Sequence, residues 1–469
     1  EYLGVNGLFS NILAFLTLAE SGIGNAMAYA LYKPLKEQNT ERIKSIMHLY
    51  DYLYWVVGVA VLVLGFLLTP FLGFLIKDMP EDMPLLSMYY MLYVLNTGIS
   101  YFYSYRRTIL ICDQKLYISN IVRTFSFTML AILQAVVLFL THSFLLYLFS
   151  MIVMTIAENL LVSYMATKYY PYLNDKNIAK LDEETKNDIR KNVGAIFIQK
   201  IGNALIDSTD NIILSKFVGI IIVGIYSNYV MLINVATRVM DNVFSSIAAS
   251  IGNLLTDQES GHSKQVFDHI LFACAGMHGF VAVGMFCLLN PFIQNWLGDE
   301  YKISMAVVFI ICVNFYLRGA RRPINLYKEA GGIFWKDRYR TLIEAATNLI
   351  VSIPLTLKCG LLGTLLGTTI SMLAFSFWYE AYLVYKNVFD AGYKDYVKQQ
   401  GIYAVLTLLV GAVSFAVCGL VPCSNWFWLI LKGIVCCLVM GTLYVLLYIR
   451  SGNAQFYLEI IKSKLGKKG

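Results

Sequence analysis

Thirteen apolar segments divide this sequence, and they restrict what the chain can fold into more than any other feature. Each holds about 17 residues or more, enough to cross the ~30 Å hydrocarbon layer of a bilayer as a helix. Because lipid offers no partner to backbone N–H and C=O groups, such segments fold as helices. The composition, 58% hydrophobic and 14% charged, excludes an ordinary soluble domain. We therefore expect an all-α polytopic membrane protein. The segments lie near residues 8–30, 52–76, 85–106, 118–140, 145–169, 193–215, 223–252, 269–290, 303–320, 341–357, 361–385, 402–421 and 426–449.

The connections between these segments alternate between basic and nearly uncharged. About 30 of the 37 Lys and Arg residues fall on one side of the membrane by this assignment, and four fall on the other. Basic connections face the cytoplasm by the positive-inside rule, which predicts that Glu1 lies outside and Gly469 inside. The net charge of +7 reflects this topology and gives no reason to expect a nucleic-acid partner.

The sequence repeats itself once. The stretch Gly7–Asn11 (GLFSN) recurs as Gly224–Asn228 (GIYSN), and Arg106-Arg107 recurs as Arg321-Arg322, at offsets of 217 and 215. Six spans fit between the copies, so the two halves share an orientation and form a parallel, pseudo-two-fold repeat. The second copy has a helix before its GIYSN and the first has none. We infer that one helix precedes residue 1, which gives fourteen spans of which thirteen are visible.

The repeat predicts two six-helix lobes and two further helices. The expected parts are an N-lobe at 1–170 (spans 2–6), a cytoplasmic linker at 171–191, a C-lobe at 192–398 (spans 7–12), and spans 13–14 with a basic tail at 399–469. No connection exceeds roughly two dozen residues, so no catalytic domain is expected. The nine cysteines have no ligand spacing and are expected to be small buried hydrophobes.

Two polar stripes follow the helices predicted around 193–215 and 223–252. A charged side chain at the bilayer centre costs at least ~2.5–3.5 kcal/mol, so the charges in these stripes must pair or face water. Helical spacing places each set on one face, and we expect both faces to line a polar cavity. The first stripe holds Lys200, Asn203, Asp207, Asp210 and Asn211, and the second Ser227, Asn234, Arg238, Asp241 and Ser245.

Several stretches resemble a known family, the polysaccharide-unit flippases of the multidrug/oligosaccharidyl-lipid/polysaccharide (MOP) exporter superfamily. The resemblance covers nearly the whole chain and is carried by Leu3-Gly4 with Gly7–Asn11, Glu20–Gly24, Ser208–Ser215, Gly224–Tyr229, Gly252–Leu254, and Arg321-Arg322-Pro323 through Phe334–Arg338. It implies a transporter without catalytic residues, cofactor or metal. The transporter would move undecaprenyl-diphosphate-linked oligosaccharide from the inner to the outer leaflet by alternating access, for cell-surface polysaccharide synthesis. We expect a monomer in the bacterial plasma (inner) membrane, surrounded by membrane lipids, with a polysaccharide polymerase as a further partner.

The substrate's diphosphate and sugars need a polar path, whereas its polyprenyl tail can stay in lipid. Arginine binds diphosphate through a bidentate fork, and lysine binds it as a point charge. Two readings stay open for Arg238, which either binds the diphosphate or neutralises Asp241 on the same helix. Lys200 either binds substrate or snorkels to the interface. The candidate cavity residues are Arg238, Lys200, Asn203, Asn234, Asp241 and Glu20.

Two further sets of residues are candidates for binding a coupling ion and for admitting the diphosphate of the substrate. Asp207 and Asp210 lie one turn apart, where they either bind a coupling cation or proton or hold polar groups of their own helix. Arginines at span ends either fix topology or form an entry collar for the diphosphate, and these are Arg318, Arg321, Arg322, Arg106 and Arg107. The alternative function is a cation-coupled multidrug or small-molecule exporter of the same superfamily, in which an acidic cavity would dominate.

Overall fold

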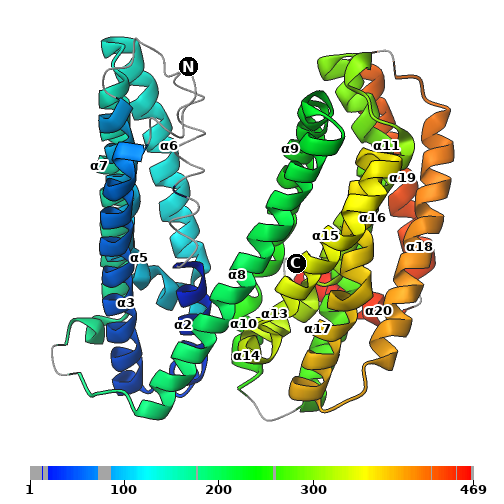
Figure 1. Ribbon diagram of the computed structural model, residues 1–469. Coiled ribbons are helices and arrows are strands. Elements are labelled where there is room, and N and C mark those ends of the chain that lie inside the picture. Colours follow the sequence, from blue (N-terminus) through cyan, green and yellow to red (C-terminus); the bar gives the residue numbers. More distant parts are fainter. Residues whose placement is uncertain are drawn as a thin grey trace. The chain divides into compact units, whose positions relative to one another are not determined.

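The computed structural model describes Leu13 and residues 20–71, 86–175, 178–256, 260–423, 425–449 and 451–465. Helices make up nearly all of these ranges, and no strand occurs in them (Figure 1). Within the same ranges, nine helices are long and apolar enough to cross a membrane. The predicted class, an all-α polytopic membrane protein, is confirmed.

The chain divides into two compact units, and the first comprises Glu1–Ile201 with Ala249–Thr256. Its core is built by α3, α5 and α7, which pack side by side (Figure 1). Aromatic side chains fill this core, among them Tyr50, Tyr54 and Tyr101. The helices are α2 (Glu20–Lys36), α3 (Thr40–Leu68), α5 (Leu86–Cys112), α6 (Leu116–Thr141) and α7 (Phe144–Tyr169).

A short helix from later in the chain, α10 (Ala248–Leu254), completes the first unit. The Lys36 ammonium donates a hydrogen bond to the Asn253 carbonyl oxygen (3.1 Å). Gly252 lies so close to the Tyr32 ring that a Cβ there would stand 2.6 Å from it. Only glycine therefore allows this contact.

The second unit comprises Gly202–Ala248 with Asp257–Gly469. Its longest helix, α11, packs against α12, α18 and α19. The C-terminal helix α20 also lies against α11, where Tyr457 donates to the His269 carbonyl oxygen (3.0 Å). The helices are α9 (Ile220–Ser245), α11 (Ser260–Leu297), α12 (Met305–Ala320), α13 (Arg322–Ala330), α14 (Phe334–Asp337), α15 (Arg340–Cys359), α16 (Leu361–Ser371), α17 (Phe377–Val384), α18 (Lys394–Gly419), α19 (Trp426–Tyr448) and α20 (Gly452–Leu465).

Small residues bring α15 and α16 into close contact. Gly363 and Gly367 are four residues apart and so lie on one face of α16. A Cβ on Gly367 would overlap Ser352, whose Cα would be 2.7 Å away, and a Cβ on Gly363 would stand 2.7 Å from the Thr356 amide nitrogen. Backbones that approach this closely gain packing energy in lipid, as in other small-xxx-small interfaces.

The boundary between the units differs from the linker expected at 171–191. A short 3₁₀ helix spans Pro171–Asn174, but α8 (Glu183–Phe217) begins inside the expected linker. It then continues without interruption through the position where the units divide, between Ile201 and Gly202. The polar residues of the expected linker thus include the first turns of a long helix.

Candidate functional site

A cavity of about 180 Å³ lies inside the second unit, enclosed by α8, α9, α11, α12, α13 and α16. Its wall combines apolar side chains with an unusual number of ionisable and amide groups for a membrane-embedded segment. These groups come from helices far apart in sequence. The ionisable and amide residues of the wall are Asp210, Asn234, Asp241, His278, Asn314, Arg318 and Arg322.

Asp210 enters the cavity wall from α8 and is held by the α15–α16 hairpin. The Thr368 hydroxyl donates to Asp210 Oδ2 at 3.0 Å. That hydroxyl in turn accepts a hydrogen bond from the Asn348 amide at 3.2 Å. The carboxylate is therefore fixed in one orientation, half-buried beside the cavity.

Asp241 pairs with a different arginine from the one that helical spacing suggested. Its carboxylate lies 3.6 Å from the guanidinium of Arg322, at the start of α13. Arg238 is exposed and forms no ion pair with any described residue. The reading in which Arg238 and Asp241 neutralise each other is therefore not what the structure shows.

Arg238 nevertheless belongs to the polar face of α9 that borders the cavity. It lies four residues after Asn234 and three before Asp241, so the three residues share one face of the helix. Asn234 and Asp241 both line the cavity. Arg238 itself is not one of the residues that line the cavity, although it shares this helix face with two that do.

Arg318 does line the cavity, and it has no carboxylate partner among the described residues. It lies in the last turn of α12, exposed, and forms no ion pair with the part of the chain that is described. Asn234, on α9, is exposed on the same cavity wall. The cavity wall thus presents one arginine, Arg318, that has no ion pair among the described residues, whereas Asp210 and Asp241 are both engaged.

Arg321 corrects the expectation of an entry collar. It is 8% exposed and belongs to a buried ionic hexad, which we define as Arg321, Lys328, Asp337, Arg340, Glu344 and Glu380. Arg321 binds Glu380 (2.8 Å) and Glu344 (3.3 Å). Such a guanidinium cannot also contact a lipid phosphate, because its partners and its burial occupy it.

The hexad contains three cations and three carboxylates, so it is neutral. Lys328 contacts Asp337 and Glu380, both at 2.7 Å. Arg340 contacts Asp337 (3.0 Å), Glu344 (2.9 Å) and Glu380 (3.0 Å). These contacts fasten α13 and α14 to α15 and α17, directly beside the end of α12 that carries Arg318.

The other two collar candidates belong to the first unit and are held by its own residues. Arg106 donates to the Thr167 hydroxyl (2.6 Å) and lines a cavity of about 110 Å³ with Asp51. Arg107 pairs with Glu158 at 2.5 Å, beside a cavity of about 460 Å³.

Of the remaining candidates, Lys200 is half-buried and Asn203 is exposed, both on α8, and neither lines the cavity. The side chains of Glu20 and Asp207 lie outside the described part of the structure. Sequence reasoning missed Asn314 and Thr368 because a single neutral polar residue in an apolar span gives no signal.

Fold and site together define a class, an all-helical chain of many membrane spans with a charged recess inside one of its units. No family model matches the sequence, and no curated protein does. Solved structures do match, and they are transporters. A mutant of the Vibrio cholerae MATE transporter VcmN gives a TM-score of 0.72 at 14% identity, covering 83% of this chain and 89% of that one.

Two further structures agree with the first. A MOP superfamily transporter from Pyrococcus furiosus gives a TM-score of 0.65 at 12% identity, covering 82% of this chain and 88% of its own. The MATE transporter ClbM, in complex with Rb⁺, gives 0.64 at 13% identity, covering 80% and 86%. The chain therefore has the fold of the membrane transporters of the MOP superfamily. Sequence identities of 12–14% support a shared fold and no more than that.

Proposed function

We propose that this protein is a flippase that moves undecaprenyl-diphosphate-linked oligosaccharide units from the inner to the outer leaflet of a bacterial plasma membrane. One observation carries the proposal beyond the transporter fold. Arg318 lines the cavity of the second unit, and Arg238 lies on the same face of α9 as the lining residues Asn234 and Asp241. Neither arginine forms an ion pair with a described residue, while Asp210 and Asp241 are each held by another group. The groups left to meet a substrate are cationic.

An anionic substrate suits such a wall. Uncompensated charges are costly within a membrane, so they mark substrate pathways or wet cavities. A diphosphate carries about two negative charges and accepts the bidentate hydrogen bonds of guanidinium groups. A site for cationic drugs would leave carboxylates free and pair its arginines. The Pyrococcus furiosus transporter has a binding pocket of reverse polarity that suggests a different function for that protein, which supports the idea that this fold accommodates pockets of either sign.

The other cavity groups suit the remainder of such a substrate. The amide of Asn234 and the phenol of Tyr226 provide hydrogen-bonding partners for sugar hydroxyls. The polyprenyl tail stays in lipid, so only the head group needs this polar path. Transfer between leaflets proceeds by alternating access, the mechanism common to transporters built from repeated bundles.

Reconstituted vesicles test the proposal directly. A fluorescent polyprenyl-diphosphate oligosaccharide is placed in both leaflets, and its loss from the inner leaflet is followed by accessibility to a glycan-binding lectin added outside. We expect the wild-type chain to move it, and the Arg238→Gln and Arg318→Gln variants to lose most of the rate. Arg190→Gln provides the matched control, because Arg190 is exposed on α8 and is not part of the cavity wall.

Two outcomes would overturn the proposal. One is wild-type rates in both cavity variants, and the other is export of a cationic dye by vesicles that leave the lipid-linked oligosaccharide unmoved. In the second case the multidrug alternative is correct. An Asp210→Asn variant, measured across pH and sodium gradients, tests the proposed coupling role, since unchanged ion dependence would exclude Asp210.

A further inference from the structure

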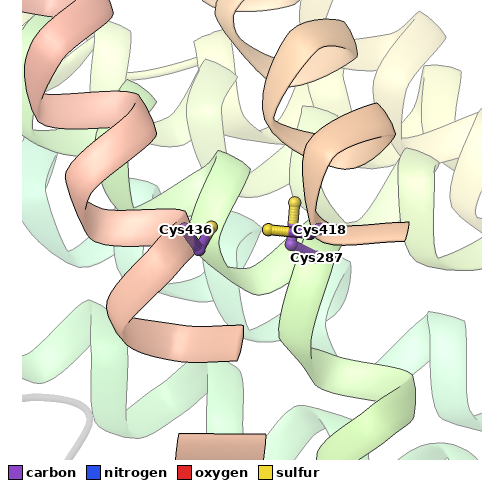
Figure 2. Close-up of side chains that lie close together, drawn as sticks. All are labelled: Cys287, Cys418 and Cys436. Atoms are coloured by element: carbon purple, nitrogen blue, oxygen red, sulfur yellow. The ribbon is translucent and has the colours of Figure 1, made fainter. Parts of the chain in front are cut away.

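Three cysteine thiols meet in the core of the second unit, outside the transport cavity. Cys287 lies on α11, Cys418 on α18 and Cys436 on α19, and their sulfur atoms all lie within 4.8 Å of one another. Figure 2 shows Cys436 directing its sulfur atom from α19 toward the other two. The three residues are 3%, 1% and 0% exposed. Three different helices thus bring three soft ligand atoms to one point.

The surroundings of the cluster are apolar. It is packed in side chains that include Val283, Val410 and Met440. The sulfur atoms of the three residues meet at a common centre instead of being dispersed among the apolar side chains around them. This convergence changes our expectation for these three residues, and only for these three of the nine cysteines.

The spacing suits a three-coordinate metal ion. Metal–sulfur bonds of about 2.3 Å arranged in a trigonal plane place sulfur atoms roughly 4 Å apart. The observed cluster reaches that geometry with small side-chain shifts. Thiolate ligands select soft ions such as Cu(I) over hard ions such as Mg²⁺ and Ca²⁺, which prefer oxygen.

The number of ligands also helps to decide which metal ion the site fits. Structural Zn²⁺ takes four ligands in a tetrahedron, and no described His, Asp or Glu joins the three thiols. We propose that Cys287, Cys418 and Cys436 form a binding site for a soft, thiophilic metal ion, and that Cu(I) is the ion it fits. The site is independent of the proposed transport function.

Charge balance supports a monovalent ion in this apolar place. Binding of Cu⁺ to three thiols with release of two protons leaves two thiolates and one thiol around the metal, with a net charge of −1. Lys432 lies four residues before Cys436 on α19 and therefore on the same helix face. Its positive charge is opposite in sign to that of the complex and therefore favours it. The bound ion would join α19 and α18 to α11.

Copper binding to the purified full chain tests this inference. The protein is loaded with Cu(I) under anaerobic conditions in the presence of a competing Cu(I) chelator, desalted and analysed for copper by mass spectrometry. We expect about one copper per chain with thiolate-to-copper absorption in the ultraviolet. Cys436→Ala should lose it, whereas Cys437→Ala should retain it because that neighbouring thiol is exposed and outside the cluster.

The controls keep the test decisive if one variant folds poorly. Cys287→Ala and Cys418→Ala are measured as well, each after size-exclusion chromatography to retain only the monodisperse fraction. Loss of copper in folded variants of the cluster, with retention in Cys437→Ala, supports the site. Equal copper in wild type and cluster variants, no copper in wild type, or a disulfide between two of the three cysteines in the freshly purified protein would overturn it.

Discussion

Replacing Glu380 with glutamine should destabilise the second unit more than any comparable change to a surface ion pair. Glu380 is fully buried and contacts Arg321 (2.8 Å), Lys328 (2.7 Å) and Arg340 (3.0 Å). Glutamine keeps the shape of the side chain and removes its charge. The hexad would then hold three cations and two carboxylates, with one positive charge left uncompensated inside the protein.

The size of the effect follows from these contacts. At separations near 2.8 Å each pair attracts by roughly 6 kcal/mol at an effective dielectric constant of about 20. The desolvation of four buried charges cancels most of that attraction, and breaking a buried pair by removing one partner typically costs roughly 3–5 kcal/mol. We expect Glu380→Gln to fall in this range, because the three cations are themselves almost inaccessible to water.

The assay is thermal unfolding in detergent. Unfolding is monitored by the reaction of the buried cysteines with a thiol-specific fluorophore as they become accessible. Glu158→Gln is the matched control, since Arg107 is the one ion-pair partner of Glu158 among the described residues and both side chains are 23% exposed. A pair of that kind contributes roughly 1 kcal/mol or less. The midpoint should fall clearly for Glu380→Gln and only slightly for Glu158→Gln.

A double variant separates charge balance from packing. Removing Lys328 together with Glu380, as Lys328→Met, leaves two guanidinium groups and two carboxylates, so neutrality returns. The double variant should be more stable than Glu380→Gln alone. The reasoning about the hexad is wrong if the stability losses of Lys328→Met and Glu380→Gln simply add in the double variant. It is also wrong if Glu380→Gln destabilises the protein no more than Glu158→Gln does.

Two further predictions concern local structure. Gly367→Ala should reduce the monodisperse fraction after extraction, because its Cβ would overlap Ser352. Gly441→Ala should be neutral, since no described atom beyond the backbone of its own helix and its chain neighbours lies within 4 Å of a Cβ there. Asp182 accepts the backbone N–H of Thr185 (2.9 Å) at the start of α8, and this bond lowers the pKa of its carboxyl group. The contribution of this cap is therefore complete above the ordinary pKa of aspartate and is lost as the pH falls through the lowered value. Hydrogen exchange, corrected for intrinsic rates, should show the amide of Thr185 losing protection on acidification in wild type but not in Asp182→Asn; equal loss in both would contradict this assignment.

Much of the architecture could be predicted from the sequence. Apolar segments of membrane length fold as helices, because lipid offers their backbone groups no hydrogen-bonding partner. The fold class and the approximate helix positions therefore follow from hydropathy alone. The extent of α8 was less accessible. Its first turns, from Glu183, are polar, and the sequence did not indicate that they continue as one helix into the apolar span.

The candidate site was predicted in part. Helical spacing placed Asp210, Asn234 and Asp241 on polar faces, and the structure brings all three to one cavity. Helical spacing could not indicate the partner of Asp241, because Arg322 comes from another helix. Nor could it reveal Thr368, whose role at Asp210 depends on the packing of a distant hairpin.

The sequence by itself determined that this is a helical membrane protein and where its charges concentrate along the chain. Each of these properties depends on residues that are adjacent in sequence. Only the tertiary structure decided what those charges do. Arg318 and Arg321 are three residues apart, yet the first borders the cavity unpaired among the described residues and the second is buried between Glu344 and Glu380. Arg318 lies in the last turn of α12, whereas Arg321 joins α12 to α13, and its carboxylate partners Glu344 and Glu380 come from distant parts of the chain.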